Sequence, residues 1–215
     1  MRNVICIGPR DWFHYKPGGI IPFKYKKKFY KLIGKTRTSD TEKHQTYIAH
    51  LSELVRQLLA NYDANILLVP MHMEESDSEL CQLLRDKSGD TQRVRVLDDD
   101  SFSASELRSV VGTAKAMVGF RLNSNIIGIS AGVPSMNIYY VDKGRVFFDQ
   151  INQQHYAQPI ESTLEDQFVN DFMKKFAILF ENRDIIHEEI SASTELLRQS
   201  VRSAIYEAFP EVPEK

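Results

Sequence analysis

The chain has 215 residues, of which 42% are hydrophobic and 26% are charged, as in globular proteins with a sizeable core. Its 27 Lys and Arg residues nearly balance its 29 Asp and Glu residues, and the net charge of −2 argues against a nucleic-acid-binding or membrane-surface protein. No apolar run approaches the roughly 20 residues of a membrane-spanning helix, and the amino terminus does not resemble a signal peptide, so we expect a cytoplasmic protein.

Short apolar runs alternate with amphipathic segments along the first two thirds of the chain. Strands are expected at Asn3–Gly8, Ile66–Val69, Val94–Leu97, Ala116–Phe120 and Met136–Tyr140, with a weaker one at Tyr156–Ile160. A long helix is expected over 41–61, a capping box at Ser103 and Glu106 begins another, and 146–151 suggests one or two helical turns. This alternation predicts an α/β fold, with an open, mostly parallel, Rossmann-like sheet and helices on both faces.

Residues 14–40 interrupt this pattern between the first strand and the first long helix. A basic run from Lys24 to Arg37 is interleaved with aromatic residues. One interpretation is a mobile basic flap over an anionic ligand, and the other, which we favour, is a solvated loop whose aromatics pack on the domain. A nucleic-acid-binding arm is the least favoured, because the rest of the chain is slightly acidic.

The last quarter of the chain is helical in pattern, because Phe168, Phe172 and Phe176 recur at four-residue spacing and apolar residues continue at helical spacing beyond them. We therefore expect residues 1–163 to form the α/β domain with the functional site, and residues 164–215 to form a helical layer packed on that domain. Cys6 and Cys81 are expected to be buried apolar residues, because two thiols alone cannot build a structural zinc site.

The stretch from Ala116 to Lys143 is the best candidate for a functional site. It reads as strand, short helix and strand, with Arg121, Asn123 and Ser124 at the junction of the first strand with the helix. Lys143 lies just past the second strand. Ligands bind at the carboxyl edge of open α/β sheets, and helix amino ends attract anions there. The pattern therefore indicates an anion site at this edge.

Other strand ends place Arg10, His72 and Asp77 at the same edge. Each arginine alone is more typical of an ion pair, but two arginines and a lysine together suit a ligand with phosphate or carboxylate groups. Neither a G-x-G-x-x-G sequence nor a P-loop is present. The acidic run Asp98–Asp100 is more typical of the turn that begins a helix than of a cation site. We expect no metal and no cofactor.

Several segments together resemble the polysaccharide pyruvyl transferases. The stretch GFRLNSNIIGISAGVP, followed by YY and DK, is similar to that family's R-L-H-S, apolar helix, G-V-P, aromatic strand and lysine signature. The segments PRDW, LLVPMHMEESDSE and FENRDIIHEEI resemble weaker family segments, and they occur in the same order. The resemblance covers most of this chain but only the carboxyl-terminal half of the family, whose members usually carry another Rossmann-like domain first, in a GT-B-like arrangement.

The resemblance implies a transferase of exopolysaccharide biosynthesis that moves a pyruvyl group from phosphoenolpyruvate, the donor substrate, to a saccharide acceptor. Arg10, Arg121 and Lys143 match basic positions of the family, Asp77 matches an acidic one, and Ser124 matches the serine of its central motif. A missing amino-terminal domain would be a further partner. Neither a nucleic acid nor a membrane span is implied.

Position 123 departs from the family pattern, because the histidine of the motif is Asn123 here. Asn hydrogen-bonds a phosphate but does not exchange a proton near neutral pH. Three explanations are open: an inactivating substitution, a relocated acid such as His72, or a domain that binds without catalysing. The alternative functions are therefore an inactive anion- or sugar-binding module and the donor half of a GT-B glycosyltransferase.

Overall fold

A computed structural model describes residues 3–12, 42–71, 77–97 and 101–209 of the chain. Its centre is a six-stranded sheet in the order β3-β2-β1-β4-β5-β6, in which every pair of neighbouring strands is parallel. The strands are β1 Asn3–Gly8, β2 Ala64–Leu68, β3 Val94–Val96, β4 Ala116–Gly119, β5 Ser135–Tyr139 and β6 Ala157–Pro159. The predicted parallel α/β sheet is therefore confirmed, and the weak sixth strand is present at the edge, where a proline is tolerated.

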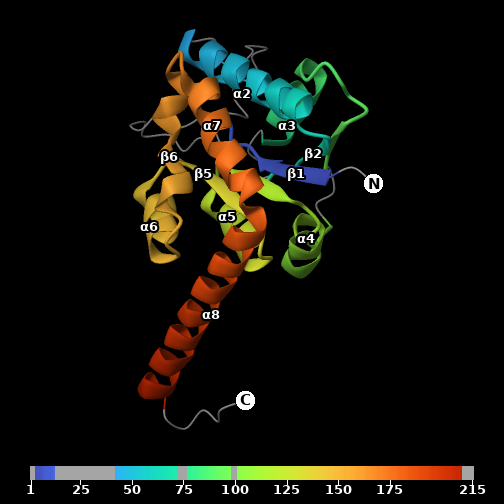
Figure 1. Cartoon of the computed structure of the whole chain (residues 1–215). Coiled ribbons are helices and arrows are strands. Elements are labelled where there is room, and N and C mark those ends of the chain that lie inside the picture. The colour runs from blue at the N-terminus through green and yellow to red at the C-terminus, as the bar shows by residue number, and fades with distance from the viewer. Residues whose placement is uncertain (1–2, 13–41, 72–76, 98–100, 210–215) are drawn as a thin grey trace, which may run out of the picture.

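Helices connect the strands and cover both faces of the sheet (Figure 1). They are α2 Glu42–Asn61, α3 Asp77–Lys87, α4 Ala104–Val111, α5 Leu122–Ser130, α6 Asp142–Gln150, α7 Phe168–Glu181 and α8 Arg183–Ala208, with short 3-10 helices η2 Gln154–Tyr156 and η3 Ile160–Leu164. The predicted capping box begins α4: the Glu106 amide donates to Ser103 Oγ at 3.3 Å, and the Ser103 amide donates to Glu106 Oε2 at 2.8 Å.

Alternation along the strands divides the core between the two faces of the sheet. Ile5 and Ile7 of β1 pack in the larger cluster, which includes the apolar residues of α2 and α7. Cys6, between them, packs on the other face with Val111 and Val133. Both cysteines are buried, as expected, and they do not form a disulfide. Burial raises the pKa of the Cys6 thiol from its ordinary value of 9.0 to about 12.

The strand order reverses between β1 and β4. The chain leaves β1 for β2 and β3 on one side, then crosses to β4, β5 and β6 on the other. In open parallel sheets of this kind the helices diverge at the reversal and leave a crevice outside the carboxyl ends of the two strands, where ligands bind. The topology therefore points to the residues that follow Gly8 and Gly119.

Helix α8 is longer than its contact with the body requires. Ile186 and Ile190 in its first turns are buried, whereas Val201 and Ile205 further along are exposed. Figure 1 shows the carboxyl-terminal half of α8 running past the sheet and away from the other helices. Within the described ranges, none of the helices combines the length and the apolar composition that crossing a membrane would need.

Three parts of the sequence prediction lie outside the described residues. They are the basic run at 24–37, the candidate acid His72 and the acidic run Asp98–Asp100.

Candidate functional site

Arg10 and Arg121 follow the two strands that flank the reversal of strand order. Gly8 and Gly119 are paired across β1 and β4, and the Phe120 amide donates to the Gly8 carbonyl at 2.9 Å. Each arginine lies two residues beyond its strand, so both side chains start at the same edge of the sheet. The topology thus places these two residues, far apart in sequence, at the same edge of the sheet.

Arg121 forms an internal ion pair with Asp77, the first residue of α3. Arg121 Nε donates to Asp77 Oδ2 at 2.7 Å, and Nη2 donates to Oδ1 at 3.1 Å. The Asp77 side chain is fully buried, and its Oδ1 also accepts the Asp11 amide at 3.3 Å. This two-pronged geometry fixes the guanidinium plane of Arg121 and neutralises its charge. Arg121 is therefore positioned at the crevice but is not its free cation.

Arg10 has the opposite character. Only 6% of the residue is exposed, and its Nε and Nη1 atoms are buried without a hydrogen-bond partner in the part of the chain that the structure describes. Its Cζ atom lies 3.7 Å from the ring centroid of Tyr140, the residue after β5, which is a cation–π contact. Buried guanidinium N–H groups are normally satisfied, so these two donors are available to a further hydrogen-bond acceptor.

The stacking on Tyr140 also locates the Arg10 guanidinium. Arg10 starts from β1, Tyr140 follows β5, and β4 lies between these strands, which are about 4.8 Å from their neighbours. The side chain must therefore cross the carboxyl end of β4, where α5 begins. Arg121 precedes α5, and a guanidinium has only donors, so it cannot cap the amides of the first turn. The path of the Arg10 side chain therefore brings its guanidinium toward the amino end of α5.

Tyr47 of α2 contacts the backbone of Arg10. Its side chain is fully buried, and its hydroxyl donates to the Arg10 carbonyl at 2.6 Å. Burial, with further contributions from the carboxylates of Asp11 and Asp77, holds the pKa of Tyr47 well above its usual range, so the hydroxyl remains a donor. The sequence placed Tyr47 within a helix but contained no sign of this second role.

The first turn of α5 packs tightly against the ends of both strands. A Cβ added to Gly8 would lie 2.8 Å from Ser124 Cβ, and one added to Gly119 would lie 2.4 Å from Asn125 Oδ1. Ser124 is buried, and its Oγ donates to the Arg121 carbonyl at 2.6 Å. The glycines are therefore what allows the helix to begin directly over the strand ends.

The remaining predicted residues lie at the same edge but outside this cluster. Asn123 is exposed on the first turn of α5, and Lys143 is exposed on the first turn of α6. A hollow of about 240 Å3 lies at the ends of β5 and β6, lined by Tyr139, Tyr140, Val141, Asp142 and Glu161. Tyr140 is thus shared by the hollow and by Arg10. The aromatic pair was visible in the sequence, but only the fold assigns Tyr140 this position.

Among the described residues no group of three or more His, Cys, Asp or Glu side chains could hold a metal ion. Comparison with known protein families gives no match, and no curated protein matches the chain significantly either.

Proposed function

We propose that this chain binds a small phosphate- or carboxylate-bearing ligand in the crevice between β1 and β4. The observation that supports this most is Arg10, whose guanidinium is buried, stacked on Tyr140 and without a hydrogen-bond partner for Nε and Nη1 among the described residues. An isolated buried cation is costly unless it is paired, and an anionic ligand would supply the missing partner.

The resemblance to polysaccharide pyruvyl transferases suggests phosphoenolpyruvate as this ligand. In that reaction two sugar hydroxyls add to the C2 carbon, the phosphate leaves, and the methylene carbon gains a proton, so that a cyclic pyruvate ketal forms. We assign the phosphate or the carboxylate to Arg10 and the α5 amides. Arg121 would form the opposite wall, and exposed Lys143 would attract the donor from solution.

The hollow beside Tyr140 is our candidate for the position of the saccharide acceptor. It is lined by the carboxylates of Asp142 and Glu161, which accept hydrogen bonds from sugar hydroxyls and repel a second anion. Its boundary with the Arg10 side chain would bring acceptor hydroxyls next to the donor. A general acid must protonate the methylene carbon; the Asn123 carboxamide does not ionise near neutral pH, so His72 is the candidate for this role.

Asn123 also favours a second candidate function, an anion-binding module that does not catalyse. The two candidates share the Arg10 site and differ only in turnover. Formation of a ketal from phosphoenolpyruvate and galactose- or mannose-containing acceptors would support the transferase. Binding of phosphoenolpyruvate without any ketal would support the module.

The binding proposal is tested by calorimetry with phosphoenolpyruvate and with inorganic phosphate. Replacing Arg10 with Met keeps an apolar stem against Tyr140 and removes the charged donors. Because a hydrogen bond to a charged group contributes about 1.5–3 kcal/mol, we expect affinity to fall about 10- to 150-fold. Arg10→Lys keeps the positive charge but loses the planar set of guanidinium donors, so its affinity should lie between those of wild type and Arg10→Met.

Arg198→Ala is the matched control, because Arg198 is an exposed arginine on α8 that pairs with Glu195. Its affinity should equal that of the wild type. Equal affinity in Arg10→Met and wild type, with circular dichroism showing both folded, would reject the proposed site.

A further inference from the structure

A second concave site lies between α2 and α7, well away from Arg10. The groove is open to solvent and has a volume of about 430 Å3, within the range of small-molecule sites, about 300–1,000 Å3. Its nearest lining residue on α2, Gln57, is ten residues beyond Tyr47, which touches Arg10. At 1.5 Å per residue the two levels are about 15 Å apart along the helix. One small ligand cannot occupy both sites.

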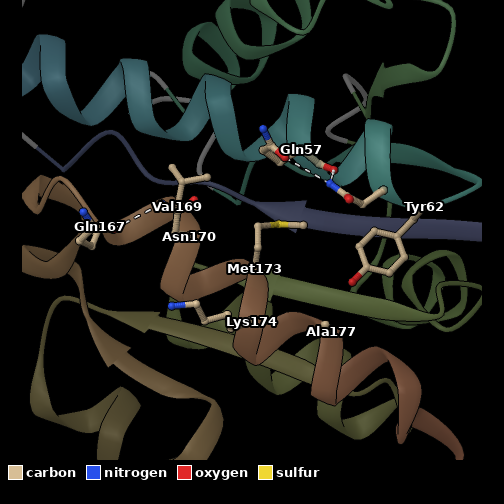
Figure 2. Close-up of a pocket in the computed structure, with 9 residues that line it drawn as sticks. Gln57, Tyr62, Gln167, Val169, Asn170, Met173, Lys174 and Ala177 are labelled. Carbon is tan, nitrogen blue, oxygen red and sulfur yellow. Dashed lines mark hydrogen bonds between the residues drawn. The ribbon is translucent and has the colours of Figure 1, made fainter.

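Four carboxamide side chains surround the groove (Figure 2). Asn61 Nδ2 donates to Gln57 Oε1 at 3.2 Å, and Asn170 Nδ2 donates to Gln167 Oε1 at 3.3 Å. These two pairs orient the amides and leave Oδ1 of Asn61, Oδ1 of Asn170 and Nε2 of Gln167 without partners among the described residues. Of these three atoms, the α2 wall offers one acceptor, and the α7 wall offers one acceptor and one donor.

The other lining residues are apolar, except for Tyr62 and Lys174. Val169, Met173 and Ala177 of α7 form an aliphatic floor, and Figure 2 shows Met173 projecting between the two helices. Tyr62 packs its ring edge-on against Phe176 at 5.3 Å between centroids. Burial, assisted by the Glu181 carboxylate, raises the pKa of Tyr62, so its hydroxyl stays protonated. The one charged lining residue, Lys174, is paired with Asp171 at 2.9 Å.

We propose that this groove binds a neutral saccharide, as a site distinct from the anion crevice. Hydroxyl groups donate and accept hydrogen bonds, as carboxamides do, and the C–H face of a sugar ring suits the aliphatic floor. The described lining residues include no Asp, Glu, His or Cys, and their titratable side chains are Tyr62 and Lys174, so we assign binding and no catalytic step to this site. The inference does not depend on which anion Arg10 binds.

An extended peptide fits the groove less well than a saccharide does. A peptide backbone presents donors and acceptors at the regular spacing of a strand, and it is usually bound along the edge of a sheet. Here the amides are grouped in two pairs on two helices, and no sheet edge lines the groove. A compact ring with hydroxyls around its rim matches this distribution.

The test is a titration of 15N-labelled protein with neutral di- and trisaccharides of galactose, mannose and glucose, followed by NMR. We expect at least one saccharide to shift the amide signals of residues 57–62 and 167–177. Asn61→Ala and Asn170→Ala each remove one hydrogen bond and should weaken binding about 2- to 12-fold. Both residues are exposed, so neither substitution should affect folding, which a thermal melt checks.

Two controls separate this site from the crevice. Gln199→Ala removes an exposed carboxamide of α8 and should leave saccharide affinity unchanged. Arg10→Met should also leave it unchanged, even where it abolishes phosphate binding. The proposal would be overturned if no saccharide of the panel bound, if binding were equal in Asn170→Ala, or if a glycine-rich peptide bound at these residues and the saccharides did not.

Discussion

Arg10 and Arg121 occupy equivalent positions in the sequence, two residues beyond a buried strand, yet their surroundings differ. Arg121 meets a buried carboxylate, whereas Arg10 meets the face of an aromatic ring. A ring attracts the cation but leaves the in-plane N–H groups unused, and a carboxylate consumes them. The difference between a structural arginine and a binding arginine is therefore decided by the partner, not by the strand that precedes it.

The Arg121–Asp77 pair leads to a prediction about stability. Asp77→Asn would remove the charge of Asp77 from the Arg121 guanidinium, whose side chain is only 13% exposed. Removing one partner of a buried pair typically costs about 3–5 kcal/mol, and we expect a loss of this size in the free energy of unfolding measured with urea.

Asp171→Asn is the control for that measurement. It breaks a pair with Lys174 whose two side chains are 60% and 75% exposed, so the change should stay within about 0.5 kcal/mol. If both substitutions cost the same, the Asp77 pair does not have the structural role assigned to it.

At the scale of elements, the sequence predicts the interior of the sheet well. Strands buried on both faces must be short apolar runs, and β1 matches its predicted bounds while β2 and β5 begin one or two residues earlier. The sequence predicted helical turns only from residue 146, because the first turn of α6, DKGR, has no apolar residue that would reveal the helical period. The sequence also located the edge that holds Arg10 and Arg121.

The arrangement within the site could not be predicted in the same way. Asp77 and Arg121 are 44 residues apart, and either arginine could have taken the carboxylate. Tyr47 and Tyr140 both contact Arg10 because the strand order brings their elements together, and no local sequence pattern predicts that order. The groove between α2 and α7 was also missed, because its carboxamides lie on the polar sides of two helices that are separated by about a hundred residues.

Helix α8 offers a matched comparison between covered and uncovered apolar residues. Ile190 is fully buried, whereas Val201, on the same side of the helix, is 59% exposed. We expect Ile190→Ala to cost about 2–5 kcal/mol of unfolding free energy, and Val201→Ala to change it by no more than about 0.5 kcal/mol. Urea unfolding of both variants checks this, and a large loss in Val201→Ala would contradict the exposure of the second half of α8.

At the scale of the whole molecule, folding keeps the Cys6 thiol protonated. The unfolded chain ionises it near pH 9.0, but the folded chain does so only near pH 12. Below pH 9 the thiol is protonated in both the folded and the unfolded chain, so its burial contributes fully to the free energy of unfolding. This contribution is lost as the pH rises toward 12. We expect wild type to lose up to about 1.4 kcal/mol per pH unit from this group, a slope that Cys6→Ala should lack.

Urea midpoints measured at several pH values from 7 upward test this expectation. Tyr47, whose folded pKa is also raised, titrates in both proteins and does not affect the difference between them. Parallel slopes for wild type and Cys6→Ala would show that the thiol is not protected by the fold.

The length of α8 also affects how the molecule moves in solution. Its 26 residues span about 39 Å, and Figure 1 shows its carboxyl-terminal half projecting from the rest of the molecule. A rod fixed to one side of a compact body turns faster about its long axis than end over end. The N–H bonds of a helix lie nearly parallel to its axis, so those of α8 relax mainly through the slow end-over-end rotation. N–H bonds of other orientations also relax through the faster rotation about the long axis. The helix therefore makes the rotational diffusion of this molecule directional.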